Sequence, residues 1–270
     1  MENMRRKDYK HNVANFFMVN EKGQVAIFVI VAVIIVAILL VILLYPRLPL
    51  SRQGVEVQPI SYLRSCIEPD LRANIAELAN TGGYENPEGY LEYNGDKIKY
   101  FCYTAEYYKT CVVQQPLIKE HFEEEISRII KVNLDNCMQN LKKEYEKRGY
   151  DVSFGNANNK VSINPGNVLV SFLTPMTIKK DSSTKSFDGF DVEFRSEMYD
   201  LLLTSVSIVD YEATYGDSET TLYMKYNPEL KVDKIKLNEG SKIYRLTNTV
   251  TNENFTFASR SLVWPPGYGL

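Results

Sequence analysis

The sequence predicts an α+β protein in which one N-terminal transmembrane helix carries a disulfide-linked ectodomain of helices packed on antiparallel sheets. Three observations lead to this fold class. An uninterrupted apolar run lies near the N-terminus, two stretches with helical periodicity each contain a cysteine, and alternating apolar positions separated by turn motifs dominate the chain after residue 150. Periods of 3.6 and 2 residues are typical of amphipathic helices and half-buried strands, respectively.

The apolar run, Val25–Leu44, contains no charged residue, glycine or proline. As a helix it would measure about 30 Å at about 1.5 Å per residue, which is the thickness of the hydrocarbon core of a bilayer. We therefore expect a transmembrane helix over 24–45 in the lipid bilayer, preceded by a cytoplasmic leader over 1–23. Basic residues are more frequent before the run than after it, and the positive-inside rule then places the ectodomain outside the cell.

The distribution of charge argues against a nucleic-acid partner. The net charge of the chain is -3, and residues 1–50 carry +3, which leaves -6 for residues 51–270. Binding to nucleic acid depends on clustered Lys and Arg side chains that neutralise phosphates. The ectodomain is mildly acidic and its sequence contains no such cluster, so we expect no nucleic acid as a partner.

The residues that lead into the apolar run, K-G-Q-V-A-I-F-V-I, resemble the class III signal of archaeal type IV pilins and archaellins. The resemblance implies that a prepilin peptidase cuts between Gly23 and Gln24, so that the mature chain begins with its membrane helix. The sequence departs from this pattern at Phe28, where many such signals carry a Glu. The alternative is a signal anchor that is not cleaved and in which Gly23-Gln24 is incidental.

All four cysteines lie on the side that we expect to be extracellular. In an oxidising compartment an even number of cysteines indicates disulfides, and four cysteines allow three pairings. Cys66 and Cys137 fall beside the apolar faces of two expected helices, whereas Cys102 and Cys111 bracket a short segment. We favour the pairs Cys66–Cys137 and Cys102–Cys111.

Residues 46–60 contain three prolines and a glycine and are expected to form a linker. The next region, 61–150, is expected to hold the two Cys-containing helices around a Tyr-rich hairpin. The first helix has apolar residues at spacings of three and four, and Pro69 should kink or split it. The second begins at Pro116 and continues toward residue 149, with a break near Asn133.

Tyrosines crowd the expected hairpin, which turns at Asn94-Gly95 because these residues accept the positive φ angles of a type I′ turn. One interpretation is an aromatic binding surface for a glycan or a partner protein, since tyrosine combines a flat apolar face with a polar tip. The other is cross-strand stacking within a sheet, which tyrosine also suits. The candidate residues are Tyr90, Tyr93, Tyr100 and Tyr103.

Residues 151–270 are expected to form a β-rich region with a helix near 196–213 and an extended C-terminal tail. Alternating apolar residues predict several strands, including a pair formed by 177–180 and 187–194 around a polar loop. A shorter helix is expected within 217–226. Three further strands are expected after it, at 231–237, 242–247 and 254–262.

The sequence contains no recognisable catalytic or metal-binding motif, so we expect no enzymatic activity, no metal site and no cofactor. The only histidines are His11 and His121, and we expect His121 to be a solvated surface residue. Cysteines held in disulfides cannot supply a Cys/His zinc site. A pair of distant carboxylates leaves no linear signature, which keeps an exported hydrolase as an alternative. Asn254-Phe255-Thr256 matches the sequon for glycosylation of Asn254.

The order of these features resembles a family of membrane-anchored proteins from small-genome archaea. The shared features are the K-G-Q-V-A-I-F-V-I anchor, a Cys helix ending in Gly-Gly, a Tyr-rich Asn-Gly hairpin, a second Cys helix, and a strand with P-M-T-I-K-K. The resemblance implies no particular activity. Our leading prediction is a non-enzymatic protein of the cell membrane whose extracellular domain binds or adheres to a ligand. The first alternative is a pilin-like subunit that self-assembles through its N-terminal helix.

Overall fold

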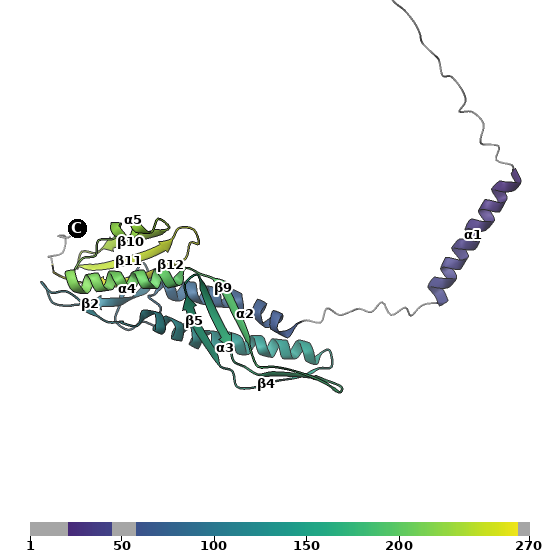
Figure 1. The fold of residues 1–270 in the computed structure, drawn as a ribbon, viewed down its shortest axis with the longest axis horizontal. Coiled ribbons are helices and arrows are strands. Elements are labelled where there is room, and N and C mark those ends of the chain that lie inside the picture. Colours follow the sequence, from purple (N-terminus) through teal and green to yellow (C-terminus); the bar gives the residue numbers. More distant parts are fainter. Residues whose placement is uncertain (1–20, 45–57, 264–270) are drawn as a thin grey trace, which may run out of the picture. The chain divides into compact units, whose positions relative to one another are not determined.

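The structure, a computed structural model, describes residues 21–44 and 58–263. The chain divides into two compact units, Met1–Glu56 and Val57–Leu270 (Figure 1). The first contains helix α1, and the described part of the second contains four helices and twelve strands. Three predicted segments lie partly or mostly outside the described residues: the leader 1–23 up to residue 20, the linker 46–60 up to residue 57, and the tail over 264–270.

Helix α1 spans Glu21–Leu44 and therefore covers the whole apolar run. Gly23 and Gln24 lie in its first turn. The side chains from Phe28 to Val41 are exposed. Within the described residues, no helix combines the length and the hydropathy that crossing a membrane requires.

Two long amphipathic helices, α2 (Pro59–Asn80) and α3 (Ile118–Glu146), pack against each other in the second unit. Both are continuous, so α2 is not split at Pro69 and the expected break near Asn133 does not occur. Pro69 lies on the exposed face of α2, where water can bond the carbonyl that proline leaves without a donor. In α3 the buried stripe passes from Ile130 to Leu134 at helical spacing without a gap.

Two disulfides crosslink the second unit. Cys66–Cys137 joins α2 to α3 with a Cα–Cα distance of 6.1 Å, and Cys102–Cys111 closes a short segment with a Cα–Cα distance of 5.3 Å. These are the pairs that the periodicity and spacing of the cysteines favoured. A disulfide between two packed helices restricts the unfolded chain more than one between near neighbours, because it closes a longer loop.

The largest sheet has the strand order β1–β2–β12–β11–β10, with β3 paired to β2. The predicted hairpin is confirmed, since β1 and β2 are antiparallel and both turn residues, Asn94 and Gly95, have positive φ. The strands of this sheet are antiparallel except for β12 and β2, which are parallel. Their bounds are Tyr90–Tyr93 (β1), Asp96–Tyr103 (β2), Val112–Val113 (β3), Leu230–Lys236 (β10), Ser241–Asn248 (β11) and Asn254–Arg260 (β12).

Two three-stranded antiparallel sheets, β4–β7–β8 and β5–β6–β9, complete the β structure. The predicted pairing of 177–180 with 187–194 is wrong, because these residues of β7 pair with 183–186 of β8, whereas β9 pairs with β6. β8 is exposed, but every second residue of β9 is buried and must face the core. The bounds are Asp151–Phe154 (β4), Asn159–Asn164 (β5), Asn167–Phe172 (β6), Met176–Lys180 (β7), Ser183–Phe187 (β8) and Phe190–Arg195 (β9).

Helix α4 (Met198–Tyr215) lies along the largest sheet and contacts β11, β12, β2 and β3 (Figure 1). The short helix α5 (Thr221–Tyr226) packs on β10. One hydrophobic core contains side chains from α2, α3, α4 and the strands. Residues from both predicted regions, 61–150 and 151–270, therefore share one core and, through β2 and β12, one sheet.

Removing the long-range disulfide with Cys66→Ser and Cys137→Ser should lower the free energy of unfolding by about 4 kcal/mol, because the cysteines are 71 residues apart. The pair Cys102→Ser and Cys111→Ser is the matched control. On the same chain-entropy argument it should lower the free energy of unfolding by about 2.5 kcal/mol, because these two cysteines are 9 residues apart. Urea denaturation followed by circular dichroism measures both. Equal costs, or a larger cost for the short loop, would contradict the argument.

Candidate functional site

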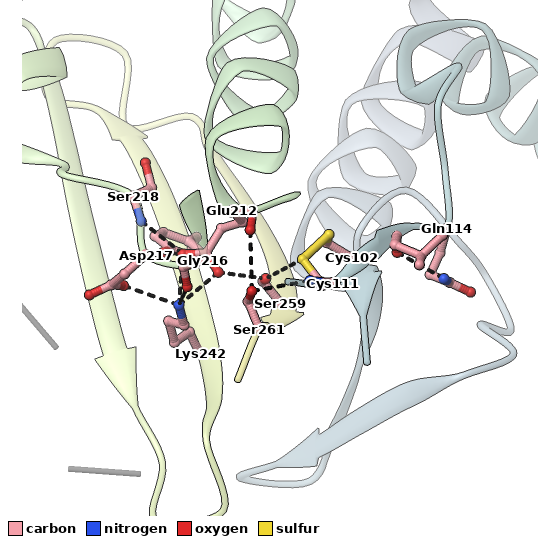
Figure 2. Close-up of a disulfide and its surroundings, with 12 residues drawn as sticks. Cys102, Cys111, Gln114, Glu212, Gly216, Asp217, Ser218, Lys242, Ser259 and Ser261 are labelled. Carbon is pink, nitrogen blue, oxygen red and sulfur yellow. Dashed lines mark hydrogen bonds and ion pairs between the residues drawn. A yellow bond between two sulfur atoms is a disulfide. The ribbon is translucent and has the colours of Figure 1, made fainter. Parts of the chain in front are cut away.

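Glu212, a residue of α4, carries a carboxylate side chain that lies in the core (Figure 2). Its exposed fraction is 0 %. Leu201, Ser205 and Ile208 precede it at spacings of four and three residues, which place all four on one face of the helix. A charge in such a position costs much free energy unless polar groups satisfy it.

The donors that satisfy Glu212 come from the strands and from the turn after α4. On β11, Tyr244 Oη donates to it at 2.5 Å and Lys242 Nζ at 2.7 Å. On β12, Ser259 Oγ donates at 3.0 Å, and the backbone N–H of Ser218 donates at 2.9 Å. These bonds fasten the C-terminal half of α4 to two neighbouring strands.

The turn that follows α4 places a second carboxylate, Asp217, beside the first. Gly216 ends the helix with φ of 87°, a left-handed conformation, and a Cβ on this residue would overlap the Val263 side chain. Glycine therefore meets both requirements at this position. Asp217 forms ion pairs with three lysines, Lys234 at 2.7 Å, Lys236 at 3.0 Å and Lys242 at 3.1 Å.

The burial and the charges of this group of side chains shift the pKa values of Tyr244 and Asp217. Desolvation and the charge of Glu212 raise the pKa of the Tyr244 hydroxyl well above its usual value. Desolvation also acts to raise the pKa of Asp217, but the hydrogen bonds and charges of the three lysines outweigh it and leave that pKa below its usual value. At neutral pH, Tyr244 is therefore a donor and Asp217 an anion.

The Cys102–Cys111 disulfide adjoins the group formed by Glu212, Asp217, Tyr244 and the three lysines, which is called the ionic cluster below (Figure 2). The backbone N–H of Cys111 donates to Ser261 Oγ at 3.1 Å, and Ser261 Oγ donates to the backbone carbonyl of Glu212 at 3.2 Å. Two hydrogen bonds thus connect the disulfide to the last turns of α4. The ionic cluster holds α4 on the sheet, and α4 in turn fixes the position of the loop that the disulfide closes.

The loop closed by this disulfide, residues 103–110, contains three exposed tyrosines, of which Tyr103 ends β2 and Tyr107 and Tyr108 lie beyond it. Tyr107 is 59 % exposed and Tyr108 is 76 % exposed. Tyr108 also has φ of 59°, a left-handed conformation that is uncommon for a bulky residue and is found at binding sites. Backbone bonds hold it there, from Tyr108 N–H to the Leu262 carbonyl at 2.7 Å and from Leu262 N–H to the Lys109 carbonyl at 3.0 Å.

A second aromatic feature is an open groove of about 400 Å³ between α4 and α5. Tyr226 on its wall is 82 % exposed. Tyr211 contacts Tyr215 in a tilted arrangement with 4.6 Å between ring centroids, so the aromatic surface continues to the last turn of α4. Glu219 bonds the backbone N–H of Thr221 at the start of α5 and is the acidic group of the lining. Loop 103–110 and this groove together are called the tyrosine-rich end below.

The four tyrosines proposed from the hairpin do not share one face. Tyr90 and Tyr93 are three residues apart in β1, so their side chains point to opposite sides of the sheet. Tyr93 and Tyr100 pack against a small apolar cluster, and Tyr100 Oη bonds Ser241 Oγ at 2.8 Å. Tyr100 and Tyr103 contact each other edge to face at 5.0 Å. Cross-strand packing therefore occupies Tyr93 and Tyr100, whereas Tyr90 and Tyr103 remain partly exposed.

Two other predicted positions are less accessible than expected. His121 is not a solvated surface residue, because it is half-buried against the Tyr84 ring with 3.8 Å between ring centroids. Burial lowers the pKa of its imidazole.

Asn254 is also half-buried, and Thr256 of the same sequon is buried within β12. Among the described residues, no group of acidic, histidine or cysteine side chains could hold a metal ion.

The ionic cluster was not predicted from sequence, although one signal for it existed. Ala213, the last residue of the predicted helix, is only partly buried, whereas Glu212 beside it is fully buried. The helical spacing of Leu201, Ser205 and Ile208 places residue 212 on the same face of the helix. An acidic residue at a core position of an amphipathic helix predicts a buried partner of opposite charge.

No protein family model, no curated protein and no solved structure matches this chain. The resemblance to archaeal membrane-anchored proteins accordingly stays a prediction. The inferences that follow rest on the residues and geometry described above.

The cluster predicts a specific loss of stability at alkaline pH. Tyr244 keeps its proton in the folded protein but loses it near pH 10 once unfolded, so its contribution is present below pH ~10 and is lost as pH rises further. Tyr244→Phe should lower the free energy of unfolding by about 2 kcal/mol at pH 7 by removing a bond to a charged group. It should also make the decline of stability above pH ~10 shallower.

Urea unfolding at a series of pH values between neutral and alkaline measures both effects. Tyr226→Phe is the matched control, because Tyr226 is largely exposed. It should leave the neutral stability within about 0.5 kcal/mol of the unmodified protein. An alkaline decline in Tyr244→Phe as steep as in the unmodified protein would contradict the assigned role of Tyr244.

Proposed function

We propose that this chain is a non-enzymatic cell-surface protein, anchored through α1 and binding an extracellular glycan or protein through the tyrosine-rich end of its ectodomain. The anchor is supported by the uncharged apolar run Val25–Leu44 and by the exposed apolar side chains along α1. The basic residues before this run support a cytoplasmic N-terminus. Two disulfides in the second unit support its location in an oxidising compartment outside the cell.

The observation that carries the binding proposal is the conformation of Tyr107 and Tyr108. Both are exposed aromatic side chains, and the left-handed backbone of Tyr108 costs on the order of 1–3 kcal/mol. The disulfide and the backbone bonds to Leu262 hold this conformation. Ordered tyrosines lose little conformational entropy on binding, which is why rigid aromatic residues dominate many interfaces.

The α4–α5 groove supports the same proposal. Its wall contains Tyr211, Tyr223 and Tyr226, and Ser207 bonds the Tyr223 hydroxyl at 2.9 Å. Aromatic faces with polar edges suit both sugar rings and peptide side chains. Loop 103–110 is connected to the end of α4 through Ser261 and Leu262, and α4 also contributes residues to the lining of the groove.

Binding should depend on Tyr107 and Tyr108 of the loop and not on Tyr90 of the hairpin. The double substitution Tyr107→Ser and Tyr108→Ser should weaken binding at least about tenfold, because it removes two exposed aromatic contacts. The measurement uses the full chain in nanodiscs, presented to intact cells and to surface polysaccharide extracted from them. Polysaccharide binding indicates a glycan ligand, and binding to cells alone indicates a protein.

Tyr90→Ser is the matched control, because Tyr90 is a partly exposed tyrosine on the hairpin. It should leave the affinity unchanged, and the midpoints of thermal unfolding of all variants should agree within about 2 °C if the folds are intact. Equal loss of binding in the control and in the double variant would refute the tyrosine-rich end as the site.

Membrane attachment should be abolished by charges in the apolar run. Ile34→Lys with Ile35→Lys should move the chain from the membrane fraction to the soluble or degraded fraction, since each buried charge costs about 3 kcal/mol at the centre of a membrane helix. Ile34→Leu with Ile35→Leu is the control and should remain attached after alkaline extraction. N-terminal sequencing of the same samples distinguishes the pilin-like alternative, which requires a mature chain that begins at Gln24.

A further inference from the structure

We propose that Lys242 and Asp217 form an intramolecular amide bond between the Lys242 side-chain nitrogen and the Asp217 side-chain carbonyl carbon. Lys242 Nζ lies 3.1 Å from Asp217 Oδ1, and these side chains are only 7 % and 11 % exposed. Their backbones lie on different elements, because Lys242 is on β11 and Asp217 is in the turn between α4 and α5. The bond would therefore join the end of α4 covalently to the sheet.

Glu212 is placed to act as the proton acceptor for this reaction. Both of its carboxylate oxygens accept a hydrogen bond from Lys242 Nζ, at 2.7 and 2.9 Å, and it has no exposed surface. An amine becomes a nucleophile only after it loses a proton, and a carboxylate in hydrogen-bond contact can take that proton. The base and the nucleophile are thus in contact before any reaction.

Two further lysines are placed to make Asp217 an acceptor for nucleophilic attack. Lys234 Nζ contacts Oδ1 at 2.7 Å and Lys236 Nζ contacts Oδ2 at 3.0 Å. Attack on the carboxyl carbon transfers negative charge to these two oxygens. Positive groups already aimed at oxygens where charge develops stabilise the tetrahedral intermediate. The five side chains together supply a nucleophile, a base, an electrophile and two stabilising cations.

The reaction balances without any oxidant, reductant or further reactant. The ammonium of Lys242 gives up two protons and forms one N–C bond to Asp217, while one C–O bond of Asp217 breaks. The first proton passes through Glu212 to an oxygen of Asp217, because an amine attacks a carboxylic acid and not its anion. The same oxygen takes the second proton after the N–C bond has formed and leaves as water. One positive and one negative charge disappear together, so the net charge of the chain does not change.

The surrounding structure favours retention of the product. Tyr244, Ser259 and the Ser218 N–H all donate to Glu212 and hold it in place. The side chains of Lys242 and Asp217 are only 7 % and 11 % exposed, which limits the access of water to the link. Holding the reacting groups in contact is worth several powers of ten in rate for an intramolecular reaction.

Peptide mapping of the full chain tests the proposal directly. After reduction, alkylation and protease digestion, the peptides that contain Asp217 and Lys242 should be recovered as one branched species, lighter than their sum by the mass of one water. Fragmentation should place the link between these two residues. Recovery of the two peptides unlinked, or a link from Asp217 to Lys234, would overturn the proposal.

Variants separate the roles within the cluster. Lys242→Arg preserves the positive charge but should yield no branched species. Glu212→Gln should slow formation of the link on the order of 100-fold, because it removes the base and keeps both reacting groups. Lys231→Arg and Asp233→Asn are the controls, since these residues form an exposed ion pair on β10, and both should retain the link. A branched species in Lys242→Arg would disprove the assignment of Lys242.

Discussion

The buried carboxylate of Glu212 is the constraint on which the arrangement of the second unit depends. A fully desolvated charge must be met by donors, and those donors lie on β11, on β12 and in the turn after α4. Because each bond requires its donor in one position, the cluster fixes the rotation of α4 on the sheet. An apolar residue at this position would leave Lys242 without its main partner, so the pair is retained or lost as a unit.

The same constraint extends to the surface through short connections. Ser261 bonds both the backbone of Glu212 and that of Cys111, and Leu262 beside it bonds Tyr108 and Lys109. A loop of this length would ordinarily sample many conformations, but its two ends are crosslinked and its tip is bonded to the chain that follows β12. The exposed tyrosines are therefore presented by a rigid support, as a binding surface requires.

Local patterns in the sequence predicted the parts of the fold that depend on near neighbours. Periodicity located α2, α3 and α4, and the phase of the first two helices identified Cys66 and Cys137 as partners. The Asn94-Gly95 turn predicted the hairpin. The pairing of β2 with β12 depends on residues about 150 positions apart and has no local signature. The candidate site was missed for the same reason, because Glu212, Lys242 and Ser259 come together only in the folded chain.

The parallel pairing of β2 with β12 sets the order in which the second unit can fold. β12 ends at Arg260, near the C-terminus, and it is the strand that connects β1–β2 to β10–β11. Until those residues have been synthesised, Phe101 of β2 lacks its stacking partner Phe257 and the sheet has an open edge. Contacts of such long sequence separation slow folding. Until β12 has formed, the edge of β2 that pairs with it and the Phe101 side chain therefore remain uncovered, which favours aggregation.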